Sequence, residues 1–356
     1  GWDEMMRVCG AVTVNDYGDT MTNLIRSNDD ANFPWLGALI GSAIIGFWYW
    51  CTDQFIVQRV LSGKNEMEAR RGTIFGAYLK LLPVFLFLIP GMIAFALHQK
   101  YIGAGGEGFL PMLANGTANA DAAFPTLVAK LLPAGVKGLV VCGILAALMS
   151  SLASLFNSSA MLFTIDFYKR FRPETPEKKL VGIGQVATVV IVILGILWIP
   201  IMRSVGDVLY TYLQDVQSVL APGIAAAFLL GICWKRTSAL GGMWGLIAGM
   251  VIGLTRLGAK VYYSNAGEVA DSTFKYLFYD MNWLFFCGWM FLFCIIVVIV
   301  VSLATKAPTA EKIQGLVFGT ATKEQKAATR ASWNHWDIIH TVIILAITGA
   351  FYWYFW

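Results

Sequence analysis

Long, almost uncharged hydrophobic blocks, separated by short polar segments, run along most of the chain. Each is close to the roughly 20 residues that a helix needs to cross about 30 Å of hydrocarbon. Transmembrane β-strands are about half that length and alternate apolar with polar residues, which these blocks do not. The pattern therefore predicts an all-α polytopic membrane protein with eight spans. They lie at residues 34–54, 73–98, 137–164, 181–202, 207–233, 238–256, 282–304 and 337–356.

Lysine and arginine are distributed unevenly between the connections of these spans. The first, third, fifth and seventh connections carry 16 of them, and the other connections and the two ends carry nine. Because cytoplasmic loops are enriched in these residues, the odd-numbered connections are predicted to be cytoplasmic. Both ends of the chain, including residues 1–33, and the long loop at 99–136 are then extracellular or periplasmic.

Composition supports the membrane class and narrows the function. Hydrophobic residues make up 57% of the chain and charged residues 13%, against about a quarter charged in soluble domains. The net charge of +4 forms no basic patch, so we expect the lipid bilayer and no nucleic acid as a partner. Because no catalytic motif or phosphate-binding glycine loop appears, neither an enzyme nor an organic cofactor is expected.

Lys80 is the clearest charged residue inside a hydrophobic block. A charge at the centre of a membrane helix costs roughly 2.5–3.5 kcal/mol on insertion scales, so such residues are usually functional. Lys80 either extends its amine to the membrane interface or donates hydrogen bonds to a substrate. The first span ends with Trp48, Tyr49 and Trp50. These aromatics form either an interfacial belt or a platform on which a sugar ring stacks.

Small and hydroxyl-bearing residues share one face of the third span, since Ala147, Ser151, Ser154 and Ser158 are spaced by four, three and four. Such a face either lets two helices approach closely or offers oxygen ligands to a hard cation.

The fifth span carries a run of polar residues that includes Gln214 and Asp215. It also contains Pro222, which removes a backbone hydrogen bond and predicts a kink or break beside a cavity.

Several stretches, in order and with few gaps over residues 30–260, resemble the sodium/solute symporter family in its sodium–glucose cotransporter branch. They are WYWCTDQ at 48–54, YLKL at 78–81, PGM at 90–92, LMSSLASLFNSSAMLFTID at 148–166, FLLG at 228–231 and WKR at 234–236.

This resemblance implies a LeuT-type inverted-repeat fold. Residues 34–234 would form the second five-helix repeat and residues 235–356 three peripheral helices. Because the chain opens on a polar segment without an initiator Met, we expect it to be part of a longer protein. N-terminal helices of the first repeat would then be required to complete both binding sites.

The resemblance also implies roles for individual residues. Sodium would bind the backbone carbonyl of Ala147 and the hydroxyls of Ser150 and Ser151. One departure concerns Gly46, which lies where sugar-transporting relatives carry a polar residue and so puts glucose or galactose in doubt. The implied sugar contacts are Lys80, Gln214, Tyr49, which caps the bound sugar, and Trp50 beside it.

The resulting prediction is sodium-coupled symport of a monosaccharide by alternating access, with sodium as the coupling ion. Another polyol such as inositol, or an amino acid or organic anion whose carboxylate pairs with Lys80, stays open as the substrate. Two further alternatives are a membrane-embedded enzyme and a sensor derived from a transporter. The short cytoplasmic loop at 306–336 favours a bacterial inner membrane.

Overall fold

The computed structural model describes residues 1–113, 116–205, 209–266 and 270–355, and these residues form helices joined by loops and a few isolated β-bridges. This confirms the predicted all-α polytopic class. Three of the elements are π-helical (η1, η3 and η4) and one is a 3₁₀-helix (η2). In chain order, the elements are α1 (Trp2–Gly10), α2 (Trp35–Cys51), α3 (Gln54–Leu61), α4 (Glu66–Pro83), η1 (Val84–Leu88), α5 (Ile89–Gly103), η2 (Ala120–Ala122), α6 (Ala123–Leu131), α7 (Ala134–Met161), η3 (Leu162–Tyr168), α8 (Lys169–Phe171), α9 (Glu177–Val205), α10 (Leu209–Cys233), α11 (Ala239–Asn265), α12 (Thr273–Lys275), η4 (Tyr276–Asp280), α13 (Trp283–Ala304), α14 (Ala310–Ile313), α15 (Lys323–Ala331) and α16 (His335–Tyr354).

Seven helices in the described part of the chain are long and apolar enough to cross a membrane, and the bent pair α2–α3 makes an eighth. The predicted first span at 34–54 is therefore corrected to a helix that bends by 50° into α3. The cause is local. The Thr52 hydroxyl donates to the carbonyl of Trp48 at 2.7 Å, and the Asp53 carboxylate accepts from the N–H of Phe55 at 3.1 Å to begin a new helix.

Several spans extend past their predicted ends. The second runs from Glu66 to Gly103 and the third from Ala134 to Phe171. The sixth, predicted to end at residue 256, continues to Ser264. In each case polar or charged residues continue the helix beyond the apolar block, so hydropathy alone places the boundary too early.

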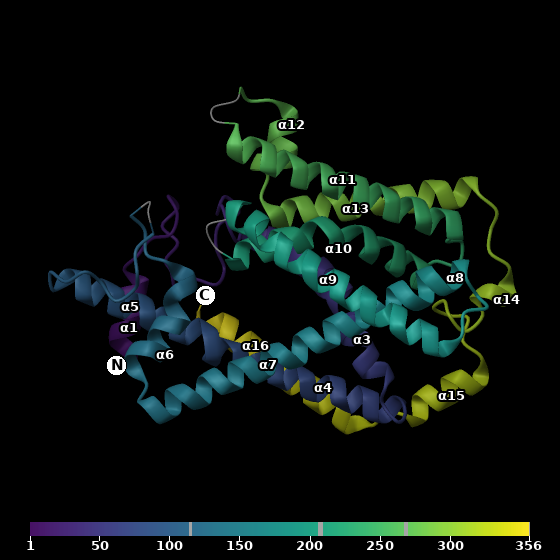
Figure 1. Ribbon diagram of the computed structural model, residues 1–356, viewed down its shortest axis with the longest axis horizontal. Coiled ribbons are helices and arrows are strands. Elements are labelled where there is room, and N and C mark those ends of the chain that lie inside the picture. The colour runs from purple at the N-terminus through teal and green to yellow at the C-terminus, as the bar shows by residue number, and fades with distance from the viewer. Residues whose placement is uncertain (114–115, 206–208, 267–269, 356) are drawn as a thin grey trace. The chain divides into compact units, whose positions relative to one another are not determined.

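The chain separates into two compact units, residues 1–96 with 209–356 and residues 97–208, and each is described by itself. In the first unit α2, α10, α11 and α13 pack together, with α10, α11 and α13 side by side in Figure 1. Glycines permit this packing. A Cβ added to Gly249 of α11 would lie 2.9 Å from the Cα of Gly223 on α10. The division into an inverted repeat at 34–234 and three peripheral helices stays a prediction.

The predicted break at Pro222 is absent from α10, which runs as one helix from Leu209 to Cys233. Pro222 is fully buried, and neighbouring Gly223 packs against α11. The proline removes one backbone hydrogen bond without ending the helix.

In the same unit α4 packs along α16, as Figure 1 shows. The phenol of Tyr78 lies 3.0 Å from Nδ1 of His340. Pro83 ends α4, and η1 follows before α5. A proline inside a span and a π-helical turn both commonly mark functional parts of membrane helices.

The second unit contains the loop at 104–119, α6, α7, η3, α8 and α9. The loop is fastened to its helices by polar contacts: the N–H of Leu110 donates to Nδ1 of His98 at 3.0 Å, and Lys130 donates to the carbonyl of Phe109 at 2.8 Å. The C-terminal part of α7 packs on the N-terminal part of α9, around Ala160 and Leu180.

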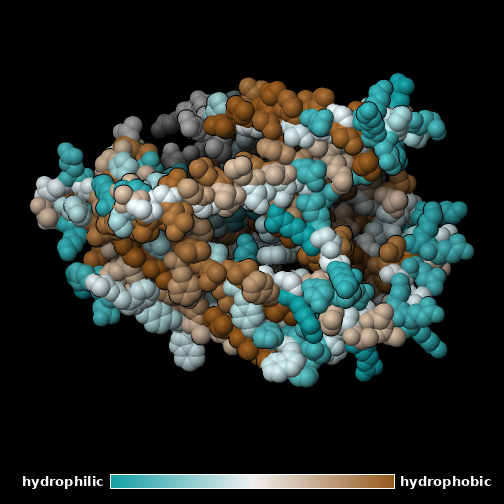
Figure 2. Space-filling model, turned by 60° about the horizontal axis from the view of Figure 1, so that its bottom comes forward, coloured by the Kyte–Doolittle hydropathy of each residue, from teal (hydrophilic) through white to brown (hydrophobic). Residues whose placement is uncertain are grey.

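Hydrophobic side chains reach the surface over long stretches of the face drawn in Figure 2. Large apolar residues are exposed on almost every span, among them Leu139, Leu197 and Val251. Such surfaces are unfavourable in water and are normal for helices that face lipid or further membrane helices.

Candidate functional site

The aromatic end of α2 meets the lysine of α4. The Lys80 amine lies 5.6 Å from the ring centroid of Tyr49 and 5.8 Å from that of Trp50. Both distances fall within the range of a cation–π interaction, worth about 0.5–1 kcal/mol at exposed sites. The structure thus brings together three of the four predicted substrate contacts, although Lys80 lies 31 and 30 positions after Tyr49 and Trp50 in the sequence.

Lys80 keeps its hydrogen-bonding capacity in this arrangement. An ammonium group carries three donors, yet Lys80 donates no hydrogen bond to any residue that the structure describes, and its side chain is exposed. Three free donors beside two aromatic faces match the hydroxyls and apolar faces of a sugar.

Gly46 lies on the same helical face as Tyr49 and Trp50, at spacings of three and four residues. A Cβ built on Gly46 would meet nothing within 4 Å. The glycine therefore leaves open space one turn below the rings. It offers no side chain to bind a substrate hydroxyl there.

Gln214, the fourth predicted substrate contact, lies half-buried on α10. Within the described residues, no hydrogen bond joins its amide to Lys80. Its role as a sugar contact stays a prediction, supported so far by the resemblance alone.

A buried charge network next to Gln214 was not foreseen. Asp215 accepts from Lys260 at 2.5 Å and lies 3.5 Å from Arg256. The Arg256 side chain is fully buried, donates to the carbonyl of Met281 at 2.8 Å, and stacks 4.0 Å over the Phe286 ring. The network joins α10 to α11 within the apolar bundle.

The sixth span was predicted to end at Arg256, which left Lys260 in the following loop, and this is wrong. Both residues lie in α11, on one face because they are four residues apart. Their charges lower the local hydropathy, which moved the predicted helix end inward. The sequence did contain a signal for this network. Two cations with i, i+4 spacing follow a span whose interior carries a single carboxylate, Asp215.

The predicted sodium ligands lie on α7. Ala147, Ser150 and Ser151 are all exposed in the described chain. The Ser150 carbonyl accepts from the Ser154 hydroxyl at 3.1 Å, and the Ser154 carbonyl accepts from Ser158 at 2.8 Å. The residues at 147–151 therefore do not serve the contact between α7 and α9. Their role as sodium ligands stays a prediction.

A cavity of about 340 Å³ opens between the C-terminal part of α7 and the N-terminal part of α9, with Asn157, Gln185 and Thr188 among its lining residues. The buried hydroxyl of Thr164 also lines it and has no hydrogen-bond partner in the described structure. Thr164 belongs to η3, where the wider π-helical turn displaces side chains from their α-helical positions.

Comparison with known proteins supplies the family. The model of the sodium:solute symporter family matches residues 2–249. The chain is 36% identical over 345 residues to the sodium/mannose cotransporter SLC5A10 of Bos taurus, covering 94% of this chain and 58% of the relative.

Two human proteins show similar identity. The sodium/myo-inositol cotransporter 2 of Homo sapiens is 38% identical over 300 residues, and the sodium/glucose cotransporter 4 of Homo sapiens is 39% identical over 304 residues. Each alignment covers 84% of this chain and 44% of the relative. The chain thus spans about half the length of the curated relatives it matches. The family match and these identities confirm the resemblance seen in the motifs, and the chain belongs to the sodium:solute symporter family.

Proposed function

We propose that this chain forms part of a sodium-coupled symporter for a monosaccharide or a related polyol. The observation that carries the proposal is the cluster of Lys80, Tyr49 and Trp50, in which a lysine with free donors lies beside two aromatic rings. The relatives support the same substrate class, since they are named as cotransporters of mannose, myo-inositol and glucose.

Sodium would bind on α7 through the Ala147 carbonyl and the Ser150 and Ser151 hydroxyls. Hydroxyl and carbonyl oxygens suit a hard cation. If sodium raises sugar affinity, the sugar raises sodium affinity by the same factor, because coupling between two sites is reciprocal. Alternating access would then expose both sites to the cytoplasm.

The proposed orientation follows from the lysine and arginine count. It puts the first, third, fifth and seventh connections, at residues 55–72, 165–180, 234–237 and 305–336, in the cytoplasm and both ends of the chain, including residues 1–33, outside. A plasma membrane, and a bacterial inner membrane in particular, is the proposed location.

Gly46 favours no single sugar. It leaves space and supplies no hydrogen bond where a polar side chain would distinguish one hydroxyl. Mannose, glucose and myo-inositol therefore all belong in the first test, together with an amino acid. The relatives, all named cotransporters, weigh against a membrane enzyme or a sensor.

The test is uptake of these labelled substrates into proteoliposomes of the full-length transporter that contains this chain and the proposed N-terminal helices, under sodium or potassium gradients. We expect uptake of at least one sugar or polyol that requires sodium and is absent in potassium. Equal uptake in both ions contradicts sodium coupling, and uptake of the amino acid alone contradicts the sugar site.

Lys80 supplies the site-specific arm of this test. Lys80→Ala removes charge-assisted hydrogen bonds worth about 1.5–3 kcal/mol, so apparent sugar affinity should fall by about one to two decades. Lys80→Arg should also weaken binding, because a planar guanidinium does not replace an ammonium. Sodium affinity should change less, since the proposed cation ligands lie on α7.

The matched control is Lys130→Ala. It removes a lysine whose amine lies 4.9 Å over the Phe109 ring, the same kind of contact in the outer loop. Sugar affinity should be unchanged in this variant. Wild-type sugar affinity in both Lys80 variants would remove Lys80 from the substrate site.

A further inference from the structure

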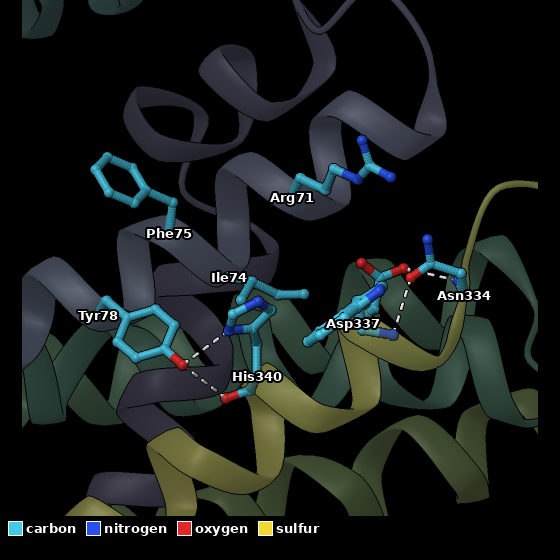
Figure 3. Close-up of a pocket in the computed structure, with 8 residues that line it drawn as sticks. Arg71, Ile74, Phe75, Tyr78, Asn334, Asp337 and His340 are labelled. Atoms are coloured by element: carbon cyan, nitrogen blue, oxygen red, sulfur yellow. Dashed lines mark hydrogen bonds between the residues drawn. The ribbon is translucent and has the colours of Figure 1, made fainter.

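A pocket of about 370 Å³ lies between the first turns of α4 and the start of α16. Figure 3 shows Arg71, Phe75 and Tyr78 on α4, with Tyr78 directed at His340 of α16, and Asn334 and Asp337 at the start of α16. Both helices begin their membrane spans here. The pocket therefore opens where headgroups and acyl chains meet, at the boundary in which tryptophan and tyrosine are commonly enriched.

The α16 wall carries a buried negative charge. Asp337 is only 8% exposed, and one of its carboxylate oxygens accepts from the backbone N–H of Asn334 at 3.0 Å. That bond belongs to the capping box that begins α16. Among the described residues, no lysine, arginine or histidine forms an ion pair with Asp337. A buried carboxylate without a cation is costly, so this wall favours a positively charged ligand group.

The opposite wall carries a positive charge that is also unpaired. Arg71 forms no ion pair and no hydrogen bond with any part of the chain that the structure describes, although its side chain lines the same pocket as Asp337. Its guanidinium matches a phosphate group, which it can bind through two parallel hydrogen bonds. The two charges share the pocket without reaching each other, which suits a ligand that carries both signs.

The remaining lining favours a lipid over a free zwitterion. The side chains of Phe75 and Trp336 are 64% and 55% exposed and present apolar surface beside the charges. At the deeper end, Tyr78 and His340 are bonded to each other and close the pocket. An occupant therefore needs an anion, a cationic amine and an apolar tail.

We propose that this pocket binds phosphatidylethanolamine, with its phosphate on Arg71, its ammonium on Asp337 and an acyl chain along Phe75 and Trp336. The ethanolamine ammonium has three N–H donors for the carboxylate. The quaternary amine of phosphatidylcholine has none. Phosphatidylglycerol has no cation at all and would leave Asp337 unpaired beside a second anion. The pocket therefore distinguishes these lipids by whether the headgroup carries an amine and whether that amine has N–H donors for Asp337.

The experiment titrates the purified, delipidated protein in detergent with short-chain phosphatidylethanolamine, phosphatidylcholine and phosphatidylglycerol, and native mass spectrometry measures the bound lipid. We expect phosphatidylethanolamine to bind at least about tenfold more tightly than the other two, which corresponds to one charge-assisted hydrogen bond. This comparison needs no variant, so it does not depend on a substitution being tolerated.

The variants assign the preference to the two walls. Arg71→Ala and Asp337→Asn should each weaken phosphatidylethanolamine binding about tenfold, and asparagine keeps an oxygen for the Asn334 cap. Arg71→Lys should retain the preference. Arg330→Ala, which removes an exposed cation of α15 outside the pocket, is the control and should bind as the wild type does.

Three results would overturn the proposal. They are similar binding of the three lipids, a preference for phosphatidylglycerol, and a phosphatidylethanolamine preference that survives both Arg71→Ala and Asp337→Asn. Sodium-coupled uptake is measured separately, so none of these results bears on the proposed transport function.

Discussion

Helices α10 and α7 are both long, apolar and rich in small residues, yet the structure uses those residues differently. In α10, Ala221, Ala225 and Ala226 are fully buried against neighbouring helices, and 39% of its most apolar stretch is buried. In α7, none of that stretch is buried, and Ala147 and Ser151 lie exposed. Small residues on a membrane helix therefore do not by themselves indicate helix packing. They serve packing only where another helix lies against them.

The largest expected effect lies in the α10–α11 contact. Asp215→Asn leaves Arg256 and Lys260 buried without a counter-charge, so unfolding free energy should fall by about 3–5 kcal/mol. Thermal unfolding of the purified protein in detergent measures this. Asp271→Asn, which removes an exposed partner of Lys275, should change little.

A second substitution shows whether the Asp215 effect is electrostatic. Adding Lys260→Met to Asp215→Asn removes one of the two uncompensated charges and should recover part of the loss. If the double variant is no more stable than Asp215→Asn, the carboxylate does not act by balancing Lys260.

The next effect concerns the glycine contact in the bundle. Gly249→Leu places a side chain against the backbone of Gly223, and overpacking of this kind typically costs about 1–3 kcal/mol. Gly258→Leu in α11 and Gly143→Leu in α7 are the controls, because a Cβ at either position meets nothing within 4 Å. Each should leave the melting temperature nearly unchanged. Equal losses at all three would mean that the bundle packs no more closely than α7.

Much of this fold follows from the sequence, and the exceptions share a cause. Block length and hydropathy located the spans, and the cost of a charge inside a block singled out Lys80 before any contact was known. The same reasoning ended the sixth span at Arg256 and left Lys260 outside it, because it treats a charge as the end of a span. A buried ion pair cancels that cost through a residue 41 or 45 positions away in sequence, which no local window contains.

The residues of the candidate site also differ in how far their contacts could be predicted from the sequence. Tyr49 and Trp50 follow one another in α2, so their meeting with Lys80 depends on a single helix contact. Gln214 and the α7 hydroxyls depend on groups contributed by more distant parts of the fold. The sequence could nominate them through polarity alone and could not show their partners.

Ser151→Ala sharpens the α7 side of the comparison with a smaller effect. If the exposed hydroxyl is a sodium ligand, the sodium concentration for half-maximal uptake should rise severalfold, about 1 kcal/mol for one lost oxygen contact. Thr255→Ala removes a hydroxyl that bonds only its own helix, to the Val251 carbonyl at 2.8 Å, and should leave sodium dependence unchanged. Unchanged sodium dependence in Ser151→Ala would indicate that this face of α7 packs against another helix and does not bind sodium.

The smallest effect is a pH dependence outside the spans. Burial opposes ionisation of Asp30, but backbone N–H groups of Phe33 and Asn32 and the charge of Arg26 outweigh it, so the pKa of Asp30 is lowered. A lowered pKa stabilises the folded form above the unfolded value of about 3.9, and this contribution is lost as pH falls through the folded value.

Below about pH 4, residues 15–33 should therefore loosen before the helix bundle does. Pepsin, which is active in acid, should cut this segment first as pH falls. The Asp30→Asn variant should be cut at higher pH and with a weaker pH dependence. First cleavage within α10 or α13 would contradict the assignment.

The junction of α2 and α3 has a mechanical consequence. The N–H of Asp53 closes α2 on the Trp48 carbonyl at 3.2 Å, while its carboxylate supplies the first acceptor of α3. One residue therefore bonds a backbone group at each of the two helix ends. Rotation about the backbone bonds of Asp53 changes the angle between α2 and α3 without breaking a main-chain hydrogen bond. The compliance of this joint is then set by side-chain contacts such as Lys80 on Tyr49, so whatever occupies that contact also determines how stiff the joint is.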